Sequence, residues 1–290
     1  MTNKKAFPFS KYNFLGNDYI IINKCNLAIP LNIDDIKHIC NRRLGVGADG
    51  VILCEHHNNI RPHTVEFLNS DGSSCGKSGN GLCIYYQWLI DSGKVVSKYM
   101  SISSGAGLSE IESSDDDSIA VNMGPVSYSH ASIGVKDLNL ECTQYNLATS
   151  AGLLDVCSLY NGNPHTVVFT DTRQSSRKKL GREIATNNLF DSGTNVEFIT
   201  DITSDVISID TWERASGHTP SSGSGACAAA AAAVARGLCK GTSIKVKMDG
   251  GDIEIFMRGS NIWQRGSASF SFSGTTPYIR YLEKSARSSL

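Results

Sequence analysis

The sequence contains no apolar run that approaches the roughly 20 residues needed to span a bilayer. Its first residues, MTNKKAFPFSKY, also lack the apolar segment of a secretory signal. These absences predict a cytoplasmic protein. Charge of one sign is not in excess either, since the 290 residues carry a formal net charge of −1. A strong field that could attract nucleic acid or an anionic membrane is therefore missing, and we expect neither partner.

Metal-binding cysteine patterns are missing too. No CxxC occurs, and Cys75 and Cys83 have no His or Cys at a zinc-finger interval. Nine cysteines, an odd number in a long chain, predict reduced thiols. Most are expected to be small core residues among aliphatic neighbours: Cys25, Cys40, Cys54, Cys142, Cys157 and Cys239. We predict no metal site.

A phosphate-binding loop is not complete in this chain. Gly45 to Gly50 (GVGADG) is rich in glycine, but it lacks the lysine and hydroxyl of a P-loop and the spacing of a dinucleotide fingerprint. The segment is predicted to be a loop that leads into a strand at Val51. Nucleotide binding is therefore disfavoured.

One short stretch does occur twice: Ser78-Gly79-Asn80-Gly81-Leu82-Cys83 and Ser222-Gly223-Ser224-Gly225-Ala226-Cys227. Each copy runs into a helix-forming segment, so each serine is predicted to stand at a helix N-terminus. The first N–H groups of a helix have no intrahelical partner and the macrodipole is positive there. Glycines let a ligand approach the backbone closely. Such a place suits a carboxylate.

The repetition extends to a second landmark. Gly16-Asn17-Asp18 before an apolar strand matches Gly162-Asn163-Pro164-His165 before another, 62 and 60 residues ahead of the two serines. Two landmarks in the same order at nearly the same spacing indicate a duplicated domain. We place one half at residues 1–124 with 267–290 and the other at 125–266.

Hydrophobic periodicity and turn residues predict the remaining elements. Helices are expected at 33–41, 84–90, 175–186 and 228–233. Strands are expected at 9–14, 19–22, 51–54, 64–68, 194–199, 206–212, 243–248, 252–257 and within 262–272. We interpret Asp115-Asp116-Asp117 as a hairpin turn. Residues 129–139 are interpreted as the link into the second half. Whether the tail beyond Gly274 is ordered is left open.

Eight short motifs, in order, resemble the diaminopimelate epimerase family of cofactor-independent amino-acid racemases: FSKYNFLGNDY, GVGADG, FLNSDGS, GNGLC, GNPHTV, NVEF, WER and GSGACAAA. The resemblance runs from about Phe9 to Gly274. It implies an α/β (α+β) fold of two pseudo-symmetric domains, each a curled, mainly antiparallel sheet around a central helix, with the active site in the cleft between them. It also implies that no cofactor is needed.

In this family two cysteines, one on each domain, invert an α-carbon, one as thiolate base and the other as thiol acid. A thiol suits this task because its pKa of about 8.5 can be lowered at a helix N-terminus. Here both positions are serine, Ser78 and Ser222. A serine hydroxyl is too weakly acidic to serve as a base without a strong partner, and no histidine is adjacent in sequence. The chain is either an engineered Cys-to-Ser form, which the near isostery favours, or a natural relative with altered chemistry.

The resemblance also assigns a substrate shell. Backbone N–H groups of Gly79, Asn80, Gly223 and Ser224 are expected to hold the carboxylate of the reacting centre. Side chains at family positions are expected to bind the amino and distal carboxylate groups: Asn17, Asn69, Asn163, Asn195, Glu213 and Arg214. His165 matches a position near the site, where a structural role is equally open. Arg214 is physically the clearest, as a fork for a carboxylate.

Several functions stay open at this point. The leading hypothesis is an epimerase of L,L- and meso-diaminopimelate. Because His218 and Pro220 depart from the usual pattern before the second repeat, a racemase of another amino acid, such as histidine, is an alternative. A non-catalytic amino-acid binder and a cysteine-free isomerase that uses Glu213 are the others. The expected partner is a small amino-acid substrate, and a homodimer is one assembly open to the chain.

Overall fold

The computed structural model describes residues 6–55, 63–94, 97–214 and 216–278. The chain divides into two compact units, residues 1–119 with 267–290 and residues 120–266. This division differs from the boundary that we placed after Gly124. The intervening residues belong to strand β8 (Ile119–Pro125), which pairs with β17 (Asn261–Gly266) of the second unit. Strand pairing therefore assigns them to that unit.

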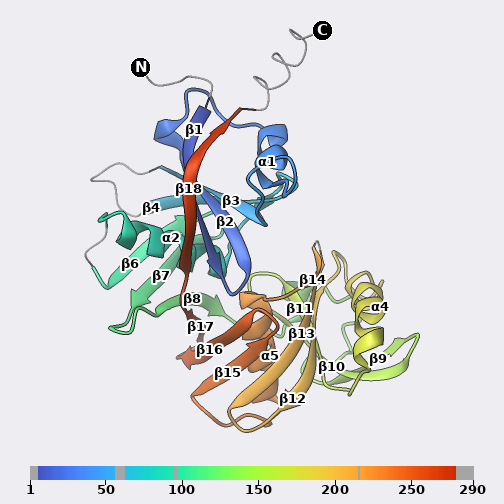
Figure 1. Ribbon diagram of the computed structural model, residues 1–290. Coiled ribbons are helices and arrows are strands. Elements are labelled where there is room, and N and C mark those ends of the chain that lie inside the picture. Colours follow the sequence, from blue (N-terminus) through green and yellow to red (C-terminus); the bar gives the residue numbers. More distant parts are fainter. Residues whose placement is uncertain (1–5, 56–62, 95–96, 215, 279–290) are drawn as a thin grey trace, which may run out of the picture. The chain divides into compact units, whose positions relative to one another are not determined.

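The described residues of the first unit form a curled sheet of eight strands. They are β1 (Ala6–Phe14), β2 (Asn17–Asn23), β3 (Gly50–Glu55), β4 (His63–Asn69), β5 (Ser74–Cys75), β6 (Tyr99–Ser104), β7 (Gly107–Ser113) and β18 (Ser269–Pro277). The pairs β2–β3 and β4–β6 are parallel and the other described pairs are antiparallel. Figure 1 shows the blue β1 beside the red β18, which is why residues from 267 onward belong to this unit.

Helix α2 (Gly79–Asp91) is the central helix of the first unit. Ten of its residues are buried, including Leu82, Tyr85 and Tyr86, and it contacts β1, β2 and β18. A helix that is apolar on nearly all sides must lie inside a core. The shorter α1 (Ile33–Cys40) begins at a capping box between Asn32 and Asp35, and the turn η1 (Lys24–Asn26) follows β2.

The second unit repeats this plan, with ten strands in its described part. They are β8, β9 (Tyr145–Thr149), β10 (Gly152–Tyr160), β11 (Pro164–Val168), β12 (Asn195–Ile202), β13 (Val206–Glu213), β14 (Gly217–Thr219), β15 (Ser243–Met248), β16 (Gly251–Arg258) and β17. The pairs β11–β12 and β13–β15 are parallel. The antiparallel pairs around them include β10–β11, β12–β13 and β15–β16.

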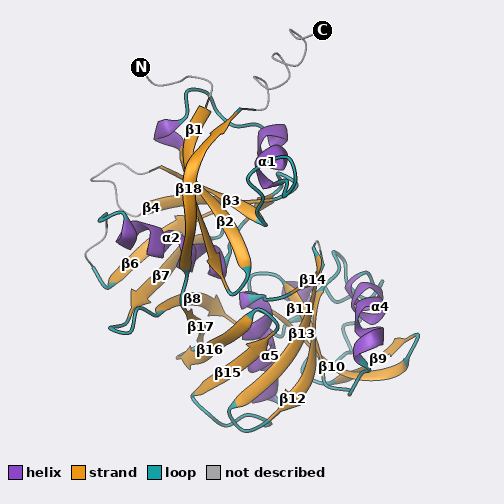
Figure 2. Cartoon of the chain, in the orientation of Figure 1, coloured by secondary structure: helices purple, strands orange, loops and turns teal. Residues whose placement is uncertain are grey.

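Helix α5 (Gly223–Ala235) is the central helix of the second unit. It contacts β10 to β13 and β15 to β17, and Figure 2 shows it among these strands. The alanine side chains from Ala228 to Ala233 are buried, and their small size lets several strands approach the helix closely. Helix α4 (Gln174–Ala185) packs on the other face of β12 and β13, and α3 (His130–Ile133) is a single turn near β10.

The two units confirm the predicted fold class. Each contains a parallel strand pair, an antiparallel partner and a buried helix in the same order, so β2, β3, β4 and α2 correspond to β11, β12, β13 and α5. The predicted helices and strands are present, most with bounds shifted by a few residues. Asp117 has φ of 61°, which fits the predicted turn between β7 and β8. Of the tail, β18 extends to Pro277, and residues 279–290 lie outside the described part.

Two further predictions were wrong. Residues 129–139 are not a simple link, because Ile133 and Val135 pack with Cys142 and Phe190 in a hydrophobic cluster of the second unit. Cys25 is exposed rather than buried, since it lies on the surface turn η1. The other five thiols predicted to be core residues are buried, and all nine cysteines are free. Within the described residues, no helix is both long and apolar enough to cross a membrane.

Candidate active site

Ser78 caps the N-terminus of α2, as its sequence predicts. Its Oγ accepts a hydrogen bond from Gly81 N–H at 3.0 Å, and its carbonyl accepts the first intrahelical bond from Leu82 N–H. The N–H groups of Gly79 and Asn80 therefore precede the first intrahelical bond of the helix. They lie where an anionic ligand would be favoured.

A second hydroxyl reaches Ser78 from the neighbouring strand β2. The Tyr19 phenol donates to Ser78 Oγ at 3.2 Å. The ring of Phe67 lies against the same turn of α2, because a Cβ at Gly81 would come within 2.6 Å of it. Ser78 is thus surrounded by a phenol and an aromatic ring, and Tyr19 is a contact that the sequence analysis missed.

Asn17 and Asn80, both predicted site residues, are brought together in the first unit. Asn80 Nδ2 donates to Asn17 Oδ1 at 3.2 Å, and Asn17 Nδ2 donates to Asp49 Oδ2 at 3.1 Å. Asn80 is buried, and its Oδ1 has no hydrogen-bond partner among the described residues. The orientation of the Asn17 amide is therefore fixed by Asp49, which belongs to the GVGADG motif.

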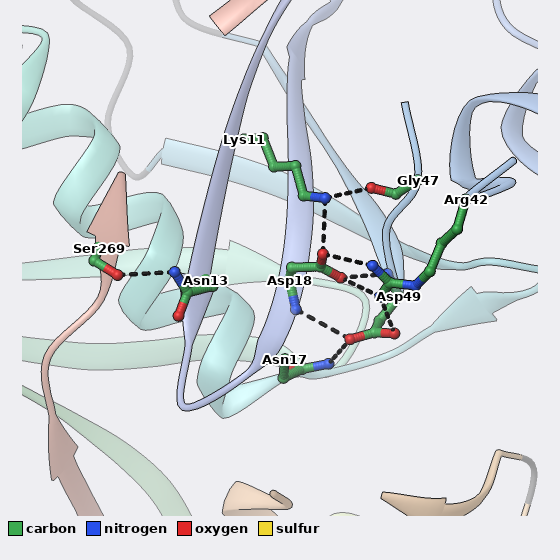
Figure 3. Close-up of polar contacts among 8 residues, drawn as sticks. All are labelled: Lys11, Asn13, Asn17, Asp18, Arg42, Gly47, Asp49 and Ser269. Atoms are coloured by element: carbon green, nitrogen blue, oxygen red, sulfur yellow. Dashed lines mark hydrogen bonds and ion pairs between the residues drawn. The ribbon is translucent and has the colours of Figure 1, made fainter. Parts of the chain in front are cut away.

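Figure 3 shows that Asp49 is part of a charged cluster around Asp18. Arg42 donates to both carboxylate oxygens of Asp18 at 2.7 and 2.9 Å and to Asp49 at 2.8 Å, and Lys11 pairs with Asp18 at 2.8 Å. Burial alone would raise the pKa of Asp18, but the hydrogen bonds from Arg42, Lys11 and the backbone of Asp49 outweigh it and lower the pKa to about 2. Gly47 of the GVGADG motif also contacts this cluster, because its carbonyl accepts a hydrogen bond from Lys11 Nζ.

Asn69 is the predicted site residue least connected to Ser78. It ends β4 opposite Gly50, and its Nδ2 donates to Ser73 Oγ at 2.9 Å within the turn that follows. Within the described residues, no hydrogen bond joins it to Asn17 or Ser78. Its family role stays a prediction.

Ser222 caps α5 in the second unit as Ser78 caps α2. Its Oγ accepts from Gly225 N–H at 3.2 Å, and Ala226 N–H bonds to its carbonyl. The serine is 4% exposed, and its own N–H lies 3.4 Å from the Met248 sulfur. The N–H groups of Gly223 and Ser224 correspond to those of Gly79 and Asn80. The local geometry of the predicted anion site is thus present in both units.

His165 is fully buried and lies at bonding distance from an acid that the sequence analysis passed over. Its Nδ1 is 2.9 Å from Glu197 Oε1, and both side chains are 0% exposed. Glu197 comes from β12, next to β11, within the motif NVEF. A charged residue inside the otherwise apolar Val196-Glu197-Phe198 was the signal that could have found it.

The second unit contains several buried polar atoms that have no hydrogen-bond partner among the described residues. Buried side-chain atoms without a hydrogen-bond partner in the described part of the chain include atoms of Asn161, Asn163, His165, Glu197, Thr211, Thr219 and Ser221. Buried polar groups in native proteins are nearly always hydrogen-bonded. Atoms of this kind are candidates for hydrogen bonds to a polar ligand. Asn163 was predicted here, and its backbone carbonyl also accepts from Asn161 N–H.

Asn195, Glu213 and Arg214 lie together at the ends of β12 and β13. Asn195 Oδ1 accepts from Arg214 N–H at 2.8 Å, and Asn195 Nδ2 donates to Pro164 O at 3.2 Å. Glu213 is the last residue of β13 and is half-buried. Arg214 is exposed and donates one Nη1 bond to Ser192 O at 2.6 Å. Its guanidinium carries five donors, so the bond to Ser192 uses only part of its capacity.

Two cavities of the structure lie away from the predicted site residues. One of about 660 Å³ in the first unit is lined by Leu27, Ile29, Leu31 and Ile36, and one of about 200 Å³ in the second unit is lined by Ala230 and neighbours. Neither is lined by a predicted site residue. In the part of the chain that the structure describes, no group of three His, Cys, Asp or Glu residues is placed to hold a metal ion.

Comparison with known proteins decides the family. The model of the family described as diaminopimelate epimerase matches residues 9–129 and 157–271. The chain belongs to the diaminopimelate epimerase family. It is 39% identical over 249 residues to diaminopimelate epimerase 2 of Nostoc sp., covering 85% of this chain and 87% of that protein. It is 31% identical to the diaminopimelate epimerase of Clostridium perfringens, covering 92% and 98%.

Solved structures share the fold at low identity. A hydroxyproline epimerase from Agrobacterium vitis, with bound trans-4-hydroxy-L-proline, matches with a TM-score of 0.69 at 16% identity, covering 96% of this chain and 94% of that one. A methylitaconate-Δ-isomerase matches with a TM-score of 0.62 at 12% identity, covering 96% and 97%. As a member of the diaminopimelate epimerase family, the chain is an isomerase of the epimerase and racemase type.

Proposed function

We propose that this protein epimerises or racemises the α-carbon of an amino acid, with diaminopimelate as its substrate. The observation that supports this most directly is the repeated geometry of Ser78 and Ser222. Each caps a buried helix whose first N–H groups can hold a carboxylate. Relatives named diaminopimelate epimerase cover most of the chain. In the proposed reaction each serine serves one face of the α-carbon.

The predicted shell supplies binding for the rest of the substrate. The guanidinium N–H groups of Arg214 that do not bond Ser192 O suit the distal carboxylate of a substrate. The buried oxygens of Asn80 and Asn163 without hydrogen-bond partners in the described chain suit an ammonium group. Donors for a second carboxylate together with acceptors for an ammonium group match a dicarboxylic diamino acid better than a neutral amino acid. The substrate and these roles belong to the proposal.

A non-catalytic amino-acid binder is the second candidate, and one observation favours it. Both serine hydroxyls already accept a helix-capping bond, from Gly81 and from Gly225. A serine that caps a helix needs no further role to explain its presence. The binder would use the same N–H groups and side chains without proton transfer.

Exchange of the α-hydrogen in D2O separates the two candidates. L,L-diaminopimelate is incubated with the chain and with its Ser78→Cys/Ser222→Cys form, and the α-proton is followed by NMR. We expect solvent deuterium at the α-carbon with the double variant and slower exchange with the present chain. Calorimetric binding without exchange in either protein would support the binder.

Two controls sharpen the result. Arg214→Lys keeps the charge but removes the bidentate fork, so it should raise KM for diaminopimelate about tenfold or more while affecting a monocarboxylic amino acid little. Glu213→Gln tests the isomerase alternative. Exchange by neither protein with diaminopimelate or any common amino acid would refute the proposed function.

A further inference from the structure

The two capping serines differ in the hydrogen bonds that their hydroxyls accept. Ser78 Oγ accepts Gly81 N–H at 3.0 Å and the Tyr19 O–H at 3.2 Å. Within the described residues, Ser222 Oγ accepts only Gly225 N–H, at 3.2 Å. The repeated helix start therefore explains one bond at each serine, and the bond from the phenol to Ser78 is an addition of the first unit.

The second unit uses the position of Tyr19 differently. Tyr19 and His165 each stand two residues after the asparagine of a glycine–asparagine turn whose glycine has positive φ. The His165 ring lies 2.9 Å from Glu197 Oε1. A phenylalanine would fill the space of Tyr19 in the first unit without a hydroxyl. Packing alone therefore does not account for the phenol oxygen beside Ser78.

Close neighbours hold the Tyr19 ring in place. Tyr19 pairs with Gly50 of β3, and a Cβ at Gly50 would come within 2.6 Å of the ring. The Phe67 ring meets the Tyr19 ring edge to face, with centroids 6.4 Å apart. Phe67 also lies against Gly81 in the first turn of α2. Because the ring has little room to turn, its hydroxyl is kept at Ser78.

The two accepted bonds decide how Ser78 can meet a ligand. A serine hydroxyl has one hydrogen and two acceptor lone pairs. Gly81 N–H and Tyr19 O–H use both lone pairs, and no described residue accepts the Ser78 hydrogen. Ser78 is half-buried, whereas Tyr19 is 7% exposed. Ser78 is therefore the residue that a ligand can contact, and it has its O–H hydrogen to offer.

We propose that Tyr19 and Ser78 form a proton relay on one face of the α-carbon, with Tyr19 as a positioning residue that acts through Ser78. When Ser78 supplies the proton, the electron pair of the α-carbanion forms the new C–H bond and the Ser78 O–H bond breaks. The pair left on Ser78 Oγ takes the hydrogen of Tyr19, so the negative charge ends on the phenol oxygen. The phenolate recovers its proton through Ser78 in the reverse direction, or from water between turnovers. The relay rests on the proposed function.

The relay supplies the acidity that a serine lacks. A serine alone is too weakly acidic to serve as a base near neutral pH. A phenol has a pKa of about 10, close to the value of about 8.5 for a thiol. While the charge lies on Ser78 Oγ, it is favoured by Gly81 N–H and by the positive end of α2. Two hydroxyls in series can thus do the work of one thiol.

The hydrogen bond can be measured without substrate. In the full chain labelled with ¹³Cζ-tyrosine, the NMR signals of Tyr19 and Tyr12 are assigned by their loss in Tyr19→Phe and Tyr12→Phe. Ser78→Ala removes the acceptor, so it should shift the Tyr19 signal and leave the Tyr12 signal in place. Ser222→Ala, in the other unit, should move neither. An unshifted Tyr19 signal in Ser78→Ala would overturn the assignment of this phenol to Ser78.

Kinetics test the relay in a Ser222→Cys background, where only the first unit still depends on a hydroxyl. There Tyr19→Phe should lower kcat for epimerisation of L,L-diaminopimelate at least about tenfold, with KM within about twofold. When Ser78→Cys is added, the thiol needs no phenol, so Tyr19→Phe should change kcat by less than about twofold. The matched control is Tyr12→Phe, which removes a phenol that donates to Asp91 at 2.8 Å. It should change neither parameter beyond about twofold in either background.

The other outcomes separate the relay from the proposed function. No loss of kcat in Tyr19→Phe, or equal losses in both backgrounds, would make Tyr19 a structural residue and overturn the relay. Epimerisation by Ser78→Cys/Ser222→Cys but not by Ser222→Cys would refute the relay and leave the proposed function standing. If no form epimerises any amino acid, both fail together, while the NMR result still decides whether Tyr19 donates to Ser78.

Discussion

Replacement of Asp18 by asparagine should destabilise the first unit at neutral pH. The Asp18 carboxylate receives two bonds from Arg42 and pairs with Lys11, and it also accepts Asp49 N–H at 2.9 Å (Figure 3). Its side chain is 12% exposed. Asparagine keeps the size but removes the charge that these donors require. The cluster also holds Asp49, which orients Asn17.

The pKa gives the magnitude. The folded value of about 2 lies below the ordinary value of 3.8, and each pKa unit corresponds to about 1.4 kcal/mol. The charge therefore contributes roughly 2.5 kcal/mol to the free energy of unfolding. Because the folded pKa is depressed, the contribution is complete above pH 4 and is lost as pH falls through about 2. Asp18→Asn should thus lose stability at pH 7 and little below pH 2.

Urea unfolding followed by Trp88 fluorescence measures this effect. Trp88 lies in α2 of the first unit, so a Trp212→Phe/Trp263→Phe background confines the signal to that unit. Asp171→Asn is the control, because Asp171 is exposed and makes no hydrogen bond or ion pair within the described residues. It should change stability by less than about 0.5 kcal/mol. A loss below about 1 kcal/mol in Asp18→Asn at pH 7, or one that persists at pH 2, would refute the reasoning.

Three further predictions follow from the same structure. Ser78→Ala and Ser222→Ala should each cost about 1 kcal/mol of stability through the lost helix cap, measured by urea unfolding, and a cost near zero would mean that the capping bonds contribute nothing. Gly225→Ala should lower the thermal midpoint of unfolding, because its Cβ would meet Glu197 Oε1 at 2.7 Å, and should cost about 1 to 3 kcal/mol of stability. The control Gly76→Ala should be nearly neutral, because the nearest neighbour of its Cβ would lie at 3.8 Å. In a thiol-labelling assay with mass spectrometry at pH 8, the exposed Cys25 should react within minutes. Burial raises the pKa values of Cys40, Cys54 and Cys157 to about 12, so these three thiols should react only after unfolding. Early labelling of those three would contradict their burial.

Local sequence determined the elements and much of the candidate site. Ser78 and Ser222 were predicted at helix N-termini because a serine before Gly-x-Gly and an apolar run is a capping pattern that depends only on neighbouring residues. The duplication was visible because the landmarks recur at nearly equal spacing. The assignment of Asn17 to the start of a strand held for the same reason, since the turn at Gly16 is local.

Tertiary structure alone decided which side chains meet. Tyr19 contacts Ser78 across 59 residues and His165 contacts Glu197 across 32, and both contacts depend on the register of strands with their neighbours. A sequence pattern sets which residues share one face of a strand, but pairing between strands is set by the whole sheet. The two serine positions could therefore be predicted from the sequence. The acid–imidazole pair near Ser222 distinguishes the two units, and it exists only because β11, β12 and α5 pack together.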